Sequence, residues 1–213
     1  MAIVVKRYSS GDLEQCVSVL AEAFVTNPLH RSAFGEGRLD QNRLFFRIGL
    51  RHMFRGDAFV ARDEEGICGY VHFTYSPHCL PPPEEIPSMA ASLLRPLGDS
   101  VPKIIQWFAR WCRLDPDEPH VHLGPIGVAP EKQGRGIGSA LMKCYLERLE
   151  HGNFPGYLET DREENVGFYE KFGFTVRRKE VLIGAPTWYM WRPSGAPSGE
   201  RGENEGGEGG AAP

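Results

Sequence analysis

The chain has 213 residues, with 24 Lys and Arg against 28 Asp and Glu, and a formal net charge of −4. Four glutamates and one arginine follow position 193, so the tail holds −3 of this charge and the remaining chain only −1. A nearly neutral body does not attract a phosphate backbone, and no apolar run is long enough to cross a bilayer. We therefore expect neither a nucleic-acid partner nor a membrane partner.

Length and composition predict one α/β domain over 1–193. The Gly/Glu-rich segment 194–213 buries too little apolar surface to fold, so we expect it to be disordered. The five cysteines are odd in number and include no Cys-x-x-Cys pair, which favours free thiols and a cytoplasmic location. The composition leaves a monomer and a homodimer open.

Hydrophobic periodicity and turn signals predict the helices and strands. A proline-rich stretch at 77–102 and a helical segment at 103–114 lie within an insertion at 77–117. Such an insertion is either a lid near the substrate site, which we favour, or an idle surface excursion. The other predicted elements are a strand at 3–8, a helix that opens at Asp12 and ends before Asn27-Pro28, a helix at 40–54, strands at 58–62, 67–75, 120–128 and 157–160, a helix from 137, a helix that starts within 161–164 and ends at Gly173, and a final hairpin of 174–181 and 187–191.

The most informative stretch connects the strand at 120–128 to the helix that follows it. Gly134, Gly136 and Gly138 alternate with other residues there. Glycines before a helix leave backbone N–H groups exposed, and the first helical turn adds unpaired N–H groups and the positive end of the helix dipole. This arrangement predicts a phosphate or diphosphate site, with Arg135 as an added positive charge. The spacing fits neither a P-loop nor a dinucleotide fingerprint.

Two separated motifs resemble the GNAT superfamily of acyl-CoA-dependent N-acetyltransferases. The first, V-x-P-x-x-Q-G-x-G-x-G at 128–138, is similar to the family's acyl-CoA signature. The second, N-V-G-F-Y-E-K-F-G-F at 165–174, looks like the family's closing helix and strand. The runs at 157–160 and 187–190 look more narrowly like the puromycin N-acetyltransferase type.

The resemblance implies the family's α/β fold, a twisted, mixed and mostly antiparallel sheet with helices on both faces. In that fold the strands at 120–128 and 157–160 are a central parallel pair that splays apart, and the pantetheine arm of the co-substrate acetyl-CoA enters the gap. The residues that the resemblance places against acetyl-CoA are Ile126, Gly127, Val128, Gln133, Gly134, Arg135, Gly136, Ile137, Gly138, Ser139 and Asn165.

The implied reaction transfers an acetyl group to a primary amine of a small molecule by direct attack, without a covalent enzyme intermediate. Tyr169 matches the family tyrosine that protonates the departing thiolate. For the base that takes the amine proton, Glu159 acting through water comes first and His122 second. Two alternatives stay open, which are acetylation of a peptide or protein amine and a non-catalytic acyl-CoA-binding regulatory domain.

His120 and His122 share one face of the strand at 120–128, because side chains alternate along a strand. A His-x-His pair raises the question of a metal site. No carboxylate or cysteine stands at a complementary local spacing, so we expect no metal.

Overall fold

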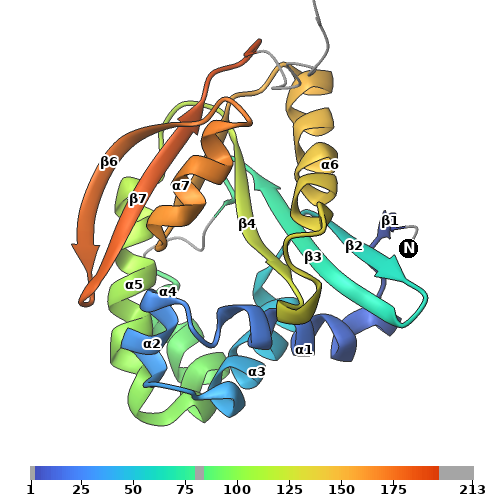
Figure 1. The fold of residues 1–213 in the computed structure, drawn as a ribbon. Helices are drawn as coiled ribbons and strands as arrows, with labels where there is room; N and C mark the ends of the chain where they lie inside the picture. Colours follow the sequence, from blue (N-terminus) through green and yellow to red (C-terminus); the bar gives the residue numbers. More distant parts are fainter. Residues whose placement is uncertain (1–2, 80–83, 197–213) are drawn as a thin grey trace, which may run out of the picture.

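A computed structural model describes residues 3–79 and 84–196 of the chain. Seven strands form one sheet in the order β1-β2-β3-β4-β5-β7-β6 (Figure 1). Every neighbouring pair of these described strands is antiparallel except β4 and β5, which are parallel. This arrangement confirms the predicted mixed α/β fold. The strands are β1 Val4–Arg7, β2 Asp57–Asp63, β3 Gly66–Tyr75, β4 Val121–Val128, β5 Gly156–Thr160, β6 Thr175–Leu182 and β7 Ala185–Arg192.

Helices cover both faces of the sheet, as Figure 1 shows. Because side chains alternate along a strand, Val60 and Tyr70 pack into a core with α1, α2, α3 and α5. Their neighbours Ala61 and Val71 pack on the opposite face with α6. The helices are α1 Leu13–Phe24, α2 Pro28–Phe34, α3 Leu39–Ile48, α4 Ile86–Met89, α5 Val101–Leu114, α6 Ile137–Gly152 and α7 Glu163–Glu170.

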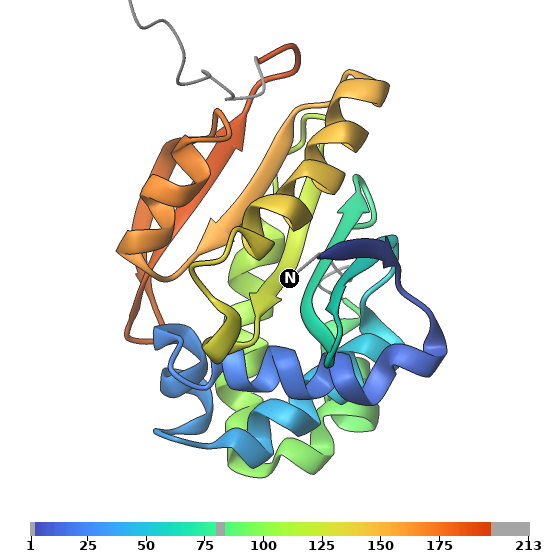
Figure 2. The same ribbon diagram turned by 45° about the vertical axis from the view of Figure 1, so that its right-hand side comes forward.

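The parallel strands β4 and β5 separate soon after they start. They pair only over the first two residues of β4, Val121 and His122. Figure 2 shows the two strands diverging toward their carboxyl ends. Pro125 has no N–H to donate to a neighbouring strand, which favours the separation. Beyond His122 the edge of β4 that faces β5 therefore has no strand partner.

Helix α2 was missed by the sequence analysis, which predicts only a helix end at Asn27-Pro28. The Asn27 side chain accepts hydrogen bonds from the backbone N–H groups of Leu29 at 2.8 Å and His30 at 3.1 Å, and so caps α2. Pro28 occupies the first turn, where its missing N–H leaves no bond unmade. The same dipeptide thus ends one helix and begins the next.

One further segment differs from the expectation. The helix predicted at 40–54 corresponds to α3, which ends at Ile48. A π-helical turn follows at Gly49–Met53. Within the proline-rich stretch, the described residues from 84 onward form short helical turns whose Leu94 and Leu97 are buried in the core. Positions 80–83 and 197–213, on which the expected proline run and most of the expected disordered tail fall, lie outside the described residues.

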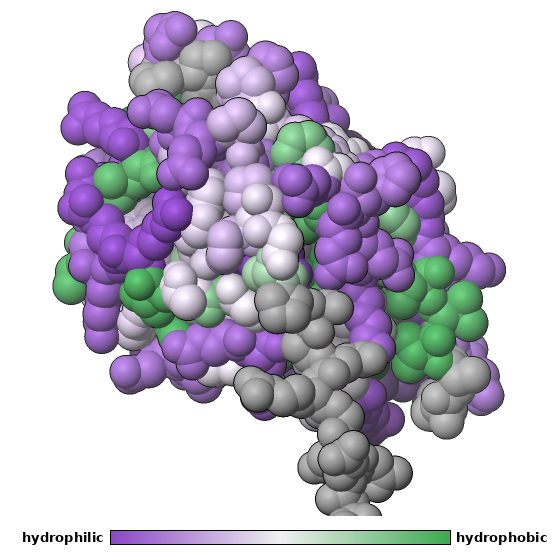
Figure 3. All heavy atoms as spheres, turned by 90° about the horizontal axis from the view of Figure 1, so that it is seen from above, coloured by the Kyte–Doolittle hydropathy of each residue, from purple (hydrophilic) through white to green (hydrophobic). Residues whose placement is uncertain are grey.

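The face of the molecule drawn in Figure 3 carries mainly hydrophilic side chains, with smaller separate hydrophobic areas. In the described ranges, the most exposed large hydrophobic residue is Val181 in β6, at 74 %. None of the described helices combines the length and the apolar composition that a bilayer crossing requires.

Candidate active site

The glycine loop between β4 and α6 faces open space. Gly134 and Gly136 have φ values of +75° and +79°, which glycine adopts without a steric penalty. A Cβ built on either glycine meets no atom within 4 Å. Gly136 is the N-cap of α6 and brings no side chain to the N–H groups of the first turn. The loop therefore offers these N–H groups and the positive helix end to a bound anion.

A cavity of about 690 Å³ lies beside this loop. It is bounded by the carboxyl end of β4, the start of α6, the end of α1 and the α7 region. All but one of the residues predicted to contact acetyl-CoA line it. They are Ile126, Gly127, Val128, Gln133, Gly134, Gly136, Ile137, Gly138, Ser139 and Asn165.

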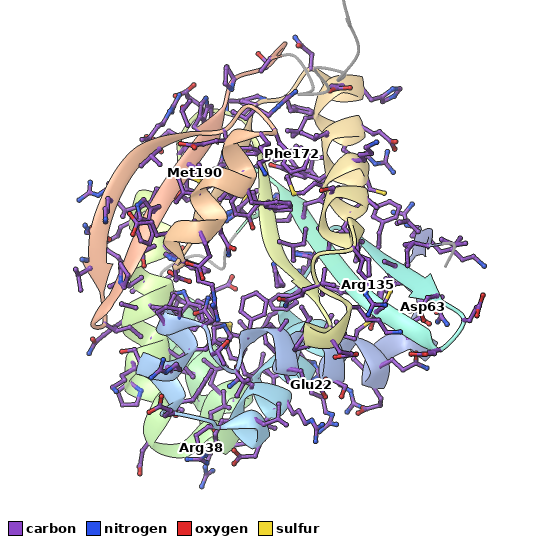
Figure 4. The ribbon with its side chains drawn as sticks, in the orientation of Figure 1. Glu22, Arg38, Asp63, Arg135, Phe172 and Met190 are labelled. Carbon is purple, nitrogen blue, oxygen red and sulfur yellow. The ribbon has the colours of Figure 1, made fainter. Side chains whose placement is uncertain are left out.

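Arg135 is the exception. Its guanidinium donates a hydrogen bond to the backbone oxygen of Glu131 at 3.1 Å, and the residue lines a separate cavity with Asp63. Figure 4 shows Arg135 on the side of the loop nearer to Asp63 and the β2–β3 hairpin. A different arginine, Arg162, lines the larger cavity. The sequence analysis treated Arg162 only as part of a helix start.

A second cavity of about 120 Å³ adjoins the first. Tyr169 lines both and stands where they meet. Of the insertion at 77–117, the residues that line this smaller cavity all come from α5. The residues common to both cavities are Phe24, Asn27, Ile126, Asn165 and Tyr169. Half of the remaining lining residues are the aromatic residues His30, Phe45, Phe46, Phe54, Trp107, Phe108 and Trp111.

Two predicted catalytic residues touch each other in the smaller cavity. His122 Nε2 lies 2.7 Å from Glu159 Oε2, since β4 and β5 are neighbours at this point. The Glu159 side chain is 2 % exposed, and its Oε1 has no hydrogen-bond partner among the described residues. Burial lowers the pKa of His122, but the carboxylates of Glu159 and Asp115 outweigh burial and hold that pKa well above its usual value. Because Oε1 of Glu159 has no partner among the described residues, it is left to accept a hydrogen bond from a bound molecule.

Tyr169 is 6 % exposed on α7. Burial raises the pKa of its phenol above the ordinary value, with a further contribution from the carboxyl of Asp161. The hydroxyl therefore keeps its proton at neutral pH and is able to donate it. Asn165 lies one helical turn earlier on the same face, and both residues line the two cavities.

A family model described as "Acetyltransferase (GNAT) family" matches residues 26–174, which is more than half of the chain. The chain belongs to the GNAT acetyltransferase family. The matched region contains the glycine loop, both cavity-lining segments of β4 and α7, and Tyr169. Membership in this family confirms the broad resemblance.

Curated acetyltransferases match this chain over part of its length. The N-alpha-acetyltransferase RimI of Mycobacterium tuberculosis is 36% identical over 94 residues, which are 42% of this chain and 58% of that protein. The mycothiol acetyltransferase of Paenarthrobacter aurescens is 32% identical over 84 residues, 36% of this chain and 26% of that protein. The chain thus aligns with about a quarter to three fifths of these relatives' lengths.

Solved acetyltransferase structures share the fold over nearly the whole chain. A Corynebacterium glutamicum protein described as "histone acetyltransferase HPA2 and related acetyltransferase" has a TM-score of 0.68 at 24% identity, covering 92% of this chain and 99% of its own. The polyamine N acetyltransferase of Drosophila melanogaster has a TM-score of 0.61 at 17% identity, covering 89% and 98%. At these identities the likeness shows the fold.

Asp161 is a site residue that the sequence analysis missed, because its position before α7 suggested only a helix start. It lines the smaller cavity and is 7 % exposed. Its carboxylate accepts hydrogen bonds from Thr187 Oγ1 at 2.8 Å and Asn27 Nδ2 at 3.5 Å. Burial raises the pKa of Asp161 to about 7, against the two hydrogen bonds and with help from the Glu159 carboxylate. A carboxyl with this pKa changes charge within the working range of an enzyme.

We expect Asp161 to make folding stability fall as pH rises. Its pKa is about 7 in the folded chain and 3.8 as the ordinary value, so its contribution is fully present below about pH 4 and is lost as pH rises to about 7. A shift of this size corresponds to at most about 4 kcal/mol. Asp161→Asn should remove this part of the pH dependence, measured as the free energy of urea unfolding at pH 5 and pH 8. Asp99→Asn, on an exposed turn, should keep the parent's change in unfolding free energy between pH 5 and pH 8. The same change in all three proteins would contradict the assignment.

Proposed function

We propose that the chain transfers the acetyl group of acetyl-CoA to the primary amine of a small molecule. The observation that carries this proposal is the meeting of two unlike cavities at Tyr169. One cavity is large and lined by a glycine loop suited to a diphosphate, whereas the other is small and aromatic. A donor and an acceptor held in them would place their reacting groups together, which is a main source of rate enhancement in bimolecular reactions.

The larger cavity has the features that acetyl-CoA requires. The N–H groups around Gly134 and Gly136 suit the diphosphate. The unpaired edge of β4 beyond His122 offers backbone groups to the amides of the pantetheine arm, in the manner of an added strand. A β4 N–H near Ile126 would then polarise the thioester carbonyl, an effect of about 3–4 kcal/mol per donor in studied enzymes.

The smaller cavity favours a compact amine over a peptide chain. Its volume of about 120 Å³ is well below the roughly 300–1,000 Å³ of pockets for drug-sized ligands. Aromatic faces attract an ammonium group, and Glu159 and Asp161 add carboxyls at the same cavity. The indole N–H groups of Trp107 and Trp111 are buried without a hydrogen-bond partner among the described residues, so they are available to an acceptor's polar atoms.

Glu159 and Tyr169 supply the two proton steps of this proposal. Glu159 Oε1, directly or through a water, takes a proton from the incoming ammonium. The neutral nitrogen then attacks the thioester carbonyl carbon and the C–N bond forms. As the C–S bond breaks, the nitrogen loses its second proton to solvent. Tyr169 gives its proton to the departing sulfur and recovers one from solvent, so the products are the amide, the free thiol and one released proton. His122 holds Glu159, because Nε2 contacts that carboxylate and Nδ1 faces Asp115.

The acceptor class separates this proposal from its competitors. The RimI relative makes a peptide amino terminus the second candidate acceptor. The likeness of 157–160 and 187–190 to the puromycin N-acetyltransferase type favours a small, partly aromatic amine. A regulatory acyl-CoA-binding domain would use the larger cavity and make no use of Glu159.

Thiol release from acetyl-CoA tests the function. We expect the purified chain to release thiol with small primary amines, with the acetylated amine identified by mass spectrometry, and not with amino-terminal peptides. Glu159→Gln should lower kcat by about 100-fold or more while acetyl-CoA binding by calorimetry stays near that of the parent. Glu147→Gln, exposed on α6 and outside both cavities, is the matched control and should leave kcat unchanged. Thiol release with peptides alone would make a peptide amine the acceptor in place of a small molecule. Acetyl-CoA binding without turnover of any amine would favour the regulatory domain.

A further inference from the structure

Four potential metal ligands converge at the start of β4, on the Nδ1 side of His122. They come from three separate segments, with Cys79 after β3, Asp115 after α5, and His120 and His122 around the start of β4. One ligand atom of each residue lies within 4.8 Å of every other. The expectation of no metal considered only residues near the histidines in sequence. The fold brings the cysteine and the carboxylate from distant parts of the chain.

Three of the six separations between these atoms match the edges of a small tetrahedron. Cys79 Sγ is 3.5 Å from His120 Nε2. Asp115 Oδ1 is 3.4 Å from His120 Nε2 and 3.3 Å from His122 Nδ1. A tetrahedral Zn²⁺ with bonds of about 2.0–2.2 Å to nitrogen and oxygen and about 2.3 Å to sulfur sets its ligand atoms about 3.3–3.6 Å apart. Direct charge-assisted N–H···O bonds are shorter, at about 2.7–2.9 Å.

Two of the atoms are buried and make no hydrogen bond. His122 Nδ1 and Asp115 Oδ1 have no hydrogen-bond partner in the described part of the chain, although they lie 3.3 Å apart, within ion-pair distance. The side chains of His120 and His122 are 0% and 5% exposed. Buried polar atoms without partners are uncommon in native proteins. A cation placed between His122 Nδ1 and Asp115 Oδ1 would satisfy both at once.

The other ring nitrogen of each histidine is already held from outside the cluster. His120 Nδ1 lies 2.7 Å from the backbone oxygen of Glu118. His122 Nε2 lies 2.7 Å from Glu159 Oε2. Partners of this kind fix the orientation of a metal-binding imidazole and decide which nitrogen it offers. His120 therefore presents Nε2, and His122 presents Nδ1, to one common point.

We propose that Cys79, Asp115, His120 and His122 form a tetrahedral Zn²⁺ site. One thiolate, two imidazoles and one carboxylate suit Zn²⁺ better than Mg²⁺ or Ca²⁺, which prefer oxygen ligands. Four protein ligands close the coordination sphere, so the site is structural, and the thiol proton passes to solvent when the thiolate binds. The metal would join the segment after β3 and the end of α5 to the sheet. Through His122 it would also hold Glu159 at the smaller cavity.

Cobalt substitution tests the site in the whole 213-residue chain, prepared without a histidine tag. We expect the purified chain to contain Zn²⁺ close to one per chain, and a chelator to remove the metal and lower the melting temperature. Reloading with Co²⁺ should give the intense visible bands of tetrahedral cobalt and a thiolate-to-cobalt charge-transfer band in the near ultraviolet. Substoichiometric Zn²⁺ together with a weak, octahedral cobalt spectrum would overturn the proposal. These readings use the parent protein and do not depend on any variant folding.

Two cysteine variants assign the thiolate. Cys79→Ser should lose the charge-transfer band and weaken Zn²⁺ binding by about 100-fold or more, because removal of a ligand exceeds the effect of removing an outer partner. Cys144→Ser, on α6 and away from the cluster, should keep the parent's spectrum and affinity. A charge-transfer band that survives in Cys79→Ser would place the cobalt elsewhere. None of these readings depends on acetyl transfer, so the metal site and the proposed function can fail separately.

Discussion

Replacing Tyr169 by phenylalanine is expected to lower kcat for thiol release by about 100- to 10,000-fold, the range that general acid catalysis contributes. The variant lacks only the hydroxyl at the junction of the two cavities. A proton must reach the departing sulfur, and the raised pKa of Tyr169 keeps that proton in place at neutral pH. The deficit should persist at saturating acetyl-CoA, because the variant loses a step of the reaction rather than a binding contact. Steady-state thiol release measures the loss of the reaction step, and calorimetry with acetyl-CoA measures any loss of binding.

Tyr70→Phe is the matched control for this experiment. Tyr70 is also buried, at 1 % exposure, but lies on β3 and lines neither cavity. It should retain the turnover of the parent, and thermal unfolding should show both variants folded. If Tyr169→Phe turned over as fast as Tyr70→Phe, Tyr169 would not be the general acid.

Replacing Gly136 by alanine is expected to raise the Kd for coenzyme A by about 10- to 100-fold, which equals the loss of one or more charge-assisted hydrogen bonds. The added methyl group stands in open space on a residue that lines the larger cavity. It would occupy room next to the N–H groups of the loop, where the diphosphate is proposed to bind. Isothermal titration calorimetry with coenzyme A measures the change without an acceptor.

Gly37→Ala separates backbone strain from lost binding. Gly37 is exposed with a φ of +66°, close to the +79° of Gly136, and a Cβ there also meets nothing within 4 Å. Both alanines therefore carry a similar left-handed penalty of about 1–2 kcal/mol. Only Gly136→Ala should weaken coenzyme A binding. Equal affinities in the two variants would remove the glycine loop from the nucleotide site.

The sequence alone determined the parts of the site whose chemistry is local. The alternation of Gly134, Gly136 and Gly138 before an amphipathic helix predicted an exposed loop at a helix start, because positive φ and bare N–H groups depend on a few adjacent residues. The order of strands and the two motifs at 128–138 and 165–174 were enough to predict the fold and to place Tyr169 and Asn165 on one helix face. These predictions needed no knowledge of which distant segments touch.

The tertiary structure decided everything that depends on contacts between distant segments. It turned Arg135 toward the hairpin that holds Asp63, raised the pKa of Asp161 by burying its carboxyl, and gathered aromatic side chains from five helices into the smaller cavity. It also brought Cys79 and Asp115 to His120 and His122 at the start of β4. Periodicity and spacing report which face of its own element a side chain occupies. They do not report what lies opposite that face, since desolvation, charge pairing and ligand geometry arise only when the elements pack together.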